Sequence, residues 1–126
     1  MSLEAKSDRR HGYLWFDVRG VLTPDNLVEL AGRIRRECDS AGIHGAIVDC
    51  SGLRGGLDPG TLYFAVQECV KLWGPKTHVA YINPPKEWVP ADDQFSRDVA
   101  HNYGGSLELF NSAEEAVAWL NDRISG

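Results

Sequence analysis

The sequence predicts a single α/β domain with a mostly parallel sheet of four or five strands and four helices. Its 126 residues can form one sizeable core but not two ordinary domains. Short apolar runs alternate along the chain with amphipathic stretches, and helix-starting or helix-stopping residues separate them. Because alternating strands and helices imply right-handed crossovers, we expect the helices to pack against a parallel sheet.

The first eleven residues differ in composition from the rest of the chain. Residues 1–11 carry five charges and almost no apolar side chains, so we expect them to be disordered. The α/β domain is then predicted to span residues 12–126. Residues 13–18 are rich in aromatic and branched side chains and alternate between two faces, which predicts the first strand.

The next helix and strand have clear boundaries. Thr23 and Pro24 predict a helix start, since threonine caps free amides and proline is tolerated at the first helical position. Apolar residues then recur every three or four positions until Gly42, which predicts the helix end. Residues 45–50 are apolar without alternation, which favours a central strand covered on both faces.

The second half of the chain repeats this strand and helix pattern. A loop over 51–57 leads to Asp58 and Pro59, which open a helix ending before Gly74. The remaining elements are a strand over 77–82, a loop over 83–90, a weaker helix over 91–103, a strand over 107–110 and a helix over 112–124. The last helix begins with the capping box formed by Ser112 and Glu115.

Composition excludes several function classes. The net charge of −5 argues against nucleic-acid binding, which needs a basic face. No apolar run reaches the length of about 18 residues that a membrane span requires. Cys38, Cys50 and Cys69 are odd in number and far apart, so we expect buried free thiols in a reducing cytoplasm rather than disulfides or a zinc motif.

No catalytic or metal-binding motif stands out. The four histidines are scattered without ligand spacing, and we expect no metal and no cofactor. The acidic residues around Asp92 and Asp93 are typical of a helix start. Ser51 lies close to Asp49 but lacks a nucleophile-elbow motif, which favours a turn hydrogen bond over catalysis. The glycines of 51–58 match neither the P-loop nor the dinucleotide fingerprint, which favours a structural turn.

Two loops define the candidate binding region. Ligands of parallel sheets collect at the carboxyl ends of strands, and both 51–57 and 83–91 leave such ends. If the strands are neighbours, Arg54, Lys86 and Trp88 share one rim. Trp88, between prolines, is expected either to fold back over the core or to mark a binding surface.

Two segments resemble the STAS-like (SpoIIAA-like) family over about residues 12–122. The segment 48–53 (VDCSGL) and the later Asp58 are similar to the family's aspartate-containing strand, short loop and helix start, and 107–120 (LELFNSAEEAVAWL) is similar to its C-terminal ending. The resemblance implies a regulatory module in which the serine after the aspartate is phosphorylated. Here Pro59 and Gly60 occupy the two serine positions, so Thr61 is the nearest candidate phosphoacceptor.

Two hypotheses of function follow. The first is a non-catalytic regulatory or interaction module that contacts a protein partner through the second helix and adjoining loops. The second is a small-molecule domain, binding an anionic ligand or a lipid, or a small enzyme, with its site at loops 51–57 and 83–91. Either is compatible with a homodimer. The candidate partner-binding or ligand-binding residues are Arg54, Asp58, Thr61, Lys86 and Trp88.

Overall fold

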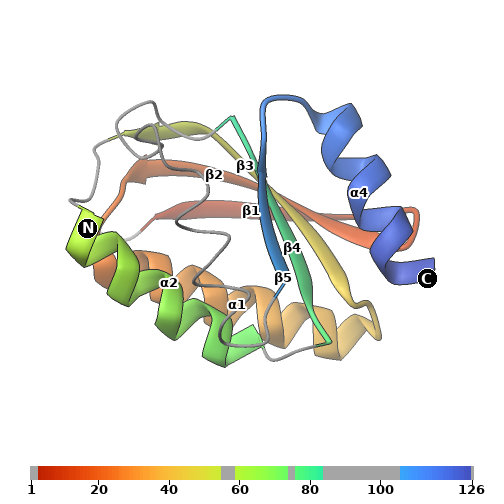
Figure 1. Cartoon of the computed structure of the whole chain (residues 1–126), viewed down its shortest axis with the longest axis horizontal. Coiled ribbons are helices and arrows are strands. Elements are labelled where there is room, and N and C mark those ends of the chain that lie inside the picture. The colour runs from red at the N-terminus through yellow and green to blue at the C-terminus, as the bar shows by residue number, and fades with distance from the viewer. Residues whose placement is uncertain (1–2, 55–58, 74–75, 84–105, 126) are drawn as a thin grey trace.

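The computed structural model describes residues 3–54, 59–73, 76–83 and 106–125. Along the chain its elements are β1 (Glu4–Arg10), β2 (Tyr13–Val21), α1 (Pro24–Ala41), β3 (Gly45–Arg54), α2 (Pro59–Trp73), β4 (His78–Ile82), β5 (Ser106–Phe110) and α4 (Ala113–Ser125), as labelled in Figure 1. The helix predicted over 91–103 lies outside the described residues. The described helices and strands confirm the predicted α/β class.

The strands form one five-stranded sheet in the order β1-β2-β3-β4-β5. The β2, β3, β4 and β5 strands run parallel to their neighbours, as the alternation of strands and helices predicts, while β1 is antiparallel to β2. The predicted loop over 51–57 is wrong at residues 51–54. These residues extend β3, because a register shift between Asp17 and Arg19 lets β2 and β3 continue pairing as far as Val21 and Arg54.

The predicted disorder over residues 1–11 is wrong at Glu4–Arg10, because these residues form the edge strand β1. Its side chain and backbone contacts hold it to α1. Ser7 donates a hydrogen bond to Glu37, and Arg33 donates one to the Ala5 carbonyl. Although burial alone would raise the pKa of Glu37, the hydrogen bonds from Ser7 and Arg33 lower it. An edge strand needs pairing on only one side, and its charges discourage pairing with other chains.

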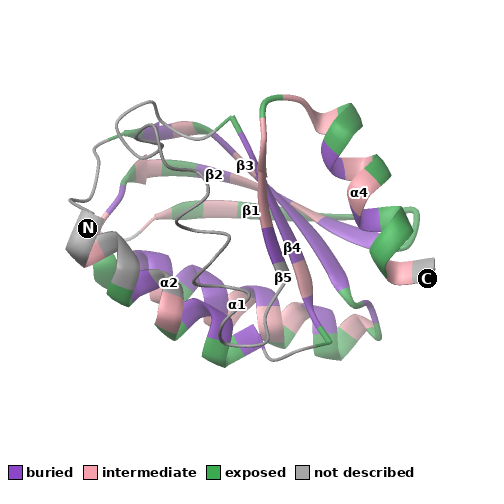
Figure 2. Cartoon of the chain, in the orientation of Figure 1, coloured by how far each residue is buried: buried purple, intermediate pink, exposed green. Residues whose placement is uncertain are grey.

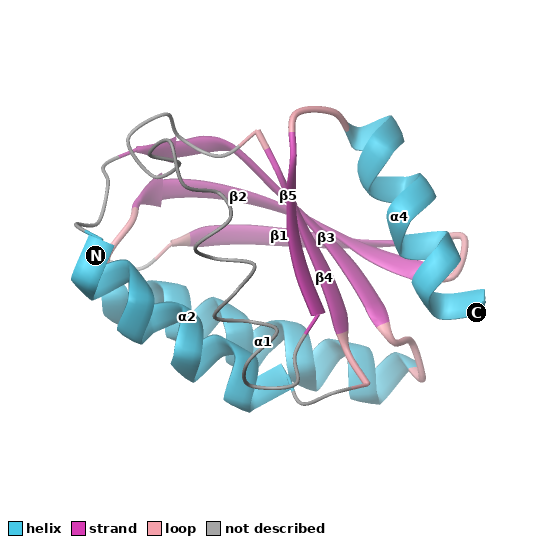
Figure 3. Ribbon diagram, viewed as in Figure 1, coloured by secondary structure: helices cyan, strands magenta, loops and turns pink. Residues whose placement is uncertain are grey.

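Helices cover the two faces of the sheet unequally. Figure 3 shows α1 and α2 along one face and α4 on the other. The larger core lies beneath α1 and α2 and includes the fully buried Phe16, Val18 and Val48. The smaller core lies beneath α4 and includes Ile47 and its neighbours on β4. Figure 2 shows the buried residues of the central strands between these helical layers.

The helix α1 has the termini that the sequence predicts. Thr23 caps the first turn by accepting a hydrogen bond from the Asn26 amide, and Pro24 opens the helix. Gly42 follows the helix with a φ of 68°, a left-handed conformation that favours glycine. Since α4 packs mainly against β3, β4 and β5, polar side chains of β1 and β2 remain accessible on that face.

Candidate functional site

The carboxyl ends of β2 and β3 form a polar cavity on the α4 side of the sheet. Its volume is about 560 Å³. We call it the carboxyl-end cavity, and its lining residues are Asp17, Arg19, Gly20, Asp49, Ser51, Gly52 and Arg54. It lies at the edge of a parallel sheet where ligands generally bind.

Strand alternation brings these polar residues to one face. Asp17 and Arg19 are two positions apart on β2, and Asp49 and Ser51 are two apart on β3. The register shift in the pairing of β2 with β3 lies between Asp17 and Arg19, and the two strands continue to pair beyond it. Asp49 accepts a hydrogen bond of 3.0 Å from the Ser51 backbone amide, which fixes its carboxylate at the cavity. The sequence predicts that Ser51 hydrogen-bonds a turn, but Ser51 lies in strand β3, and the hydrogen bond to Asp49 comes from its backbone amide.

Gly52 allows β2 and β3 to approach closely at the cavity floor. A Cβ atom there would lie 2.7 Å from the Arg19 Cγ and 2.9 Å from the Val18 carbonyl oxygen. Both distances are shorter than real Cβ contacts, and the carbonyl belongs to the backbone. A side chain at position 52 would therefore displace Arg19 and strain the pairing of the strands.

The charges of the carboxyl-end cavity are mixed. Arg19 and Arg54 supply two guanidinium groups, whereas Asp17 and Asp49 supply two carboxylates. Among the described lining residues there is no histidine or lysine beside the Ser51 hydroxyl. The arrangement suits recognition by hydrogen bonds and ion pairs, since arginine binds planar anions in a bidentate manner.

The structure places two of the candidate site residues. Arg54 is exposed at the end of β3 and lines the cavity, while Thr61 is half-buried in the first turn of α2. Asp58, Lys86 and Trp88 lie outside the described residues, so their shared rim stays a prediction. The sequence analysis missed Arg19 as a site residue because β2 was predicted to end at Val18.

The outer surface of α2 carries an exposed aromatic side chain. Phe64 is 68% exposed, whereas Ala65, Cys69, Val70 and Trp73 on the same helix are buried. Glu68 and Leu72 are also exposed and lie one and two turns farther along the helix. We call Thr61, Phe64, Glu68 and Leu72 the outer face of α2.

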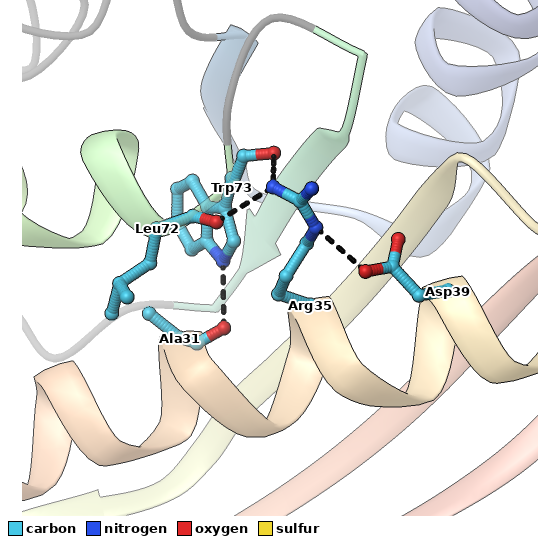
Figure 4. Close-up of polar contacts among 5 residues, drawn as sticks. All are labelled: Ala31, Arg35, Asp39, Leu72 and Trp73. Atoms are coloured by element: carbon cyan, nitrogen blue, oxygen red, sulfur yellow. Dashed lines mark hydrogen bonds and ion pairs between the residues drawn. The ribbon is translucent and has the colours of Figure 1, made fainter.

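Contacts with α1 fix which face of α2 points outward. The Trp73 indole donates a hydrogen bond of 3.1 Å to the Ala31 carbonyl. Arg35 of α1 donates hydrogen bonds to the carbonyls of Leu72 and Trp73 and is itself held by Asp39, as Figure 4 shows. These bonds join the last turn of α2 to the middle of α1, so the outer face of α2 has a defined orientation.

The three cysteines are buried free thiols, as predicted. Burial raises the pKa of Cys38 to about 11 and that of Cys69 to about 12, with smaller contributions from neighbouring acidic residues. Across residues 3–54, 59–73, 76–83 and 106–125, no group of three or more histidine, cysteine or acidic side chains is arranged to hold a metal ion. Within the same ranges, every helix is too short or too polar to cross a membrane.

Comparison with known proteins identifies the fold. Neither family models nor curated proteins match the sequence. Among solved structures, an anti-sigma factor antagonist from Mycobacterium paratuberculosis superposes with a TM-score of 0.62 at 12% identity, covering 96% of each chain. An uncharacterized DUF3478 protein with a SpoIIAA-like fold from Shewanella loihica PV-4 has a TM-score of 0.55 at 22% identity, covering 94% of this chain and 93% of that one.

These similarities confirm the architecture that the STAS-like resemblance implies. The chain has a STAS/SpoIIAA-like fold. At identities of 12% and 22% the similarity extends to the fold alone.

Proposed function

We propose that this chain is a non-catalytic regulatory module that acts by binding a protein partner through the outer face of α2. The observation that carries the proposal is the 68% exposure of Phe64 on a helix whose Ala65, Cys69 and Trp73 are buried. Aromatic side chains, phenylalanine included, are enriched at protein interfaces, where a few residues carry most of the binding energy. The solved protein of the same fold from Mycobacterium paratuberculosis is an anti-sigma factor antagonist, which supports a partner of the anti-sigma factor type.

Thr61 supplies the regulatory part of this proposal. It lies in the first turn of α2, one turn before Phe64. A phosphate there would be stabilised by the positive end of the helix dipole and would add negative charge beside the outer face of α2. We include Asp58, Lys86 and Trp88 in the proposed binding surface because their segments follow the carboxyl ends of β3 and β4 in the chain.

The test is quantitative binding to an anti-sigma factor of the same organism. Phe64→Ser is expected to weaken binding at least about tenfold, since truncating an interface hot spot costs about 2 kcal/mol. Val21→Ser is the matched control, because Val21 is also an exposed apolar side chain but lies on β2, away from the outer face of α2. Thr61→Glu mimics the phosphorylated charge, whereas Thr61→Val removes the hydroxyl.

Two outcomes would contradict the proposal. Equal loss of binding in Phe64→Ser and Val21→Ser would indicate that the stability of the folded chain, rather than the Phe64 contact, controls affinity. Unchanged binding in Phe64→Ser would remove the outer face of α2 as the contact surface. Circular dichroism of each variant verifies that the helix is retained.

The carboxyl-end cavity supports a second candidate, the binding of an anionic small molecule or lipid headgroup. Arg19 and Arg54 provide charge-assisted donors at a cavity of about 560 Å³. A thermal-shift screen with nucleotides, carboxylates and phospholipid headgroups tests it, since a ligand that binds only the folded state raises Tm. The shift should disappear in Arg54→Ala and persist in Arg36→Ala, an exposed arginine outside this cavity.

A further inference from the structure

A cluster of basic side chains lines a second cavity, at the opposite end of the sheet. This cavity lies at the amino-terminal ends of β3 and β4 and has a volume of about 270 Å³. We call it the amino-end pocket, and its lining residues are His44, Lys76, His78, Arg123 and Ile124. Four of the five are cationic or become so on protonation, in a chain whose net charge is −5. Among the described residues that line it there is no carboxylate side chain, in contrast to the carboxyl-end cavity.

Three separate segments bring these side chains together. The His78 amide donates a hydrogen bond of 2.8 Å to the His44 carbonyl, which joins the approaches to β3 and β4. Arg123 comes from the last turn of α4, and its guanidinium lies 5.4 Å from the centre of the Trp119 ring. The cation–π contact holds the guanidinium near the helix surface.

Gly45 explains why α4 ends so close to the start of β3. A Cβ atom at Gly45 would lie 2.5 Å from the Ile124 Cδ1 and 2.9 Å from the Leu120 Cδ1. The last turns of α4 therefore pack directly on the backbone of β3. The amino-end pocket is therefore formed by the packing of α4 on β3 and not by a surface loop alone.

The neighbouring basic side chains of the amino-end pocket affect the pKa of His78. Burial, together with the positive charge of Arg123 and the interaction with His44, lowers the pKa of His78. The His78 Nδ1 atom is buried and has no hydrogen-bond partner among the residues that the structure describes. A bound anion would reduce the repulsion between these cationic side chains.

We infer that the amino-end pocket binds a tetrahedral oxyanion of the phosphate class, either as free phosphate or as the phosphate group of a small organic ester. The class of ligand follows from the hydrogen-bond donors that line the pocket. Lysine, arginine and protonated histidine present N–H groups from different directions, and a tetrahedral anion has acceptor oxygens in as many directions. This site is separate from the outer face of α2 and from the carboxyl-end cavity, so it adds a ligand to the proposed regulatory module.

The experiment titrates the full chain with inorganic phosphate at constant ionic strength and follows the histidine ring signals by NMR. The signals of His44 and His78 are expected to shift together, with a Kd on the order of 1 mM, and the pKa of His78 should rise in the complex. Arg123→Gln and Lys76→Gln should each weaken binding about tenfold. Arg36→Gln is the matched control because it removes an exposed arginine that lines neither the carboxyl-end cavity nor the amino-end pocket, and it should leave the Kd unchanged.

Ethyl phosphate in a parallel titration distinguishes the two sources of the anion. Tighter binding of the ester identifies an organic phosphate as the ligand, and equal or weaker binding identifies the free ion. The inference is overturned if neither histidine signal shifts at about 50 mM phosphate, or if Arg36→Gln weakens binding as much as Arg123→Gln does. A thermal melt without anion verifies that each variant is folded. Arg123→Lys keeps the positive charge and should retain most of the affinity for phosphate.

Discussion

At the scale of single residues, Asn26 shows what sequence patterns can and cannot specify. Thr23 and Pro24 predict the start of α1 correctly, because capping and the missing proline amide are local effects. Asn26 was not anticipated, since its role depends on a residue outside the helix. It is 3% exposed, accepts a 2.8 Å hydrogen bond from the Thr23 amide and donates one of 2.8 Å to the Val21 carbonyl.

We expect Asn26→Ala to lower the free energy of unfolding by about 2 kcal/mol. The substitution leaves the Val21 carbonyl without this donor and removes half of the capping box. Asn26→Asp keeps the acceptor for the Thr23 amide but loses the donor to the Val21 carbonyl. The free energy of unfolding should therefore fall by a comparable amount. Urea denaturation measures both. Glu29→Ala, an exposed position on the same helix, is the control and should change stability by less than about 0.5 kcal/mol.

His78 makes stability depend on pH. Its pKa in the folded protein lies below the ordinary value of 6.5, because of burial and of the neighbouring Arg123 and His44. The unfolded chain therefore takes up the proton first, and stability should fall as pH decreases through 6.5 and on through the folded pKa. The difference in stability between pH 8 and pH 5 should shrink in His78→Gln but not in His11→Gln, whose ring is exposed. Equal pH profiles for His78→Gln and the parent chain would contradict this account.

At the scale of whole elements, apolar periodicity predicted where α1 and α2 lie but not how they are joined. The buried stripes of both helices are visible in the sequence because they recur every three or four residues. Arg35 belongs to the polar part of α1, so periodicity assigns it to solvent. In the structure it binds the carbonyls at the end of α2. Such a contact depends on the tertiary position of the second helix.

The prediction for the segment that forms β1 was wrong for a related reason. Its charged sequence lacks the apolar side chains that a core requires, and composition alone therefore predicted disorder over residues 1–11. The strand is held by its pairing with β2 and by Arg33 and Glu37 of α1, which are distant in sequence. Prediction from local composition is weakest where an element is stabilised mainly by its partners.

Arg35→Ala should loosen the last turn of α2 selectively. The variant loses two hydrogen bonds to helix-terminal carbonyls, and we expect a decrease of about 1 kcal/mol in the free energy of unfolding. Hydrogen exchange should accelerate at the C-terminal amides of α2 more than at those of β3. Arg36→Ala removes the neighbouring exposed arginine and should leave the exchange pattern unchanged. Uniform acceleration throughout the chain would show that the effect is not local.

At the scale of the whole molecule, the sequence predicts a candidate site at one end of the sheet and does not indicate the pocket at the other end. Arg54 was placed correctly near a carboxyl end, because strand order and the rule for parallel sheets are enough to place it. The pairing of β2 with β3 beyond residue 50 was needed to bring Arg19 to the same cavity. The amino-end pocket combines histidines, a lysine and an arginine that are up to 79 positions apart, from His44 to Arg123. No linear spacing rule identifies such a set.

The three buried thiols provide a test of how cooperatively the molecule unfolds. Cys38, Cys50 and Cys69 lie on α1, β3 and α2 and share the larger core. Because burial suppresses the thiolate and blocks access, none should react with an aromatic disulfide reagent in native buffer on the timescale of minutes. If the core opens as one unit, all three should react at the same rate as urea is raised, about as fast as global unfolding allows. Mass spectrometry of partly labelled protein separates the alternatives: fully labelled and unlabelled chains indicate one cooperative unit, whereas singly labelled chains would show that one helix opens independently of the sheet.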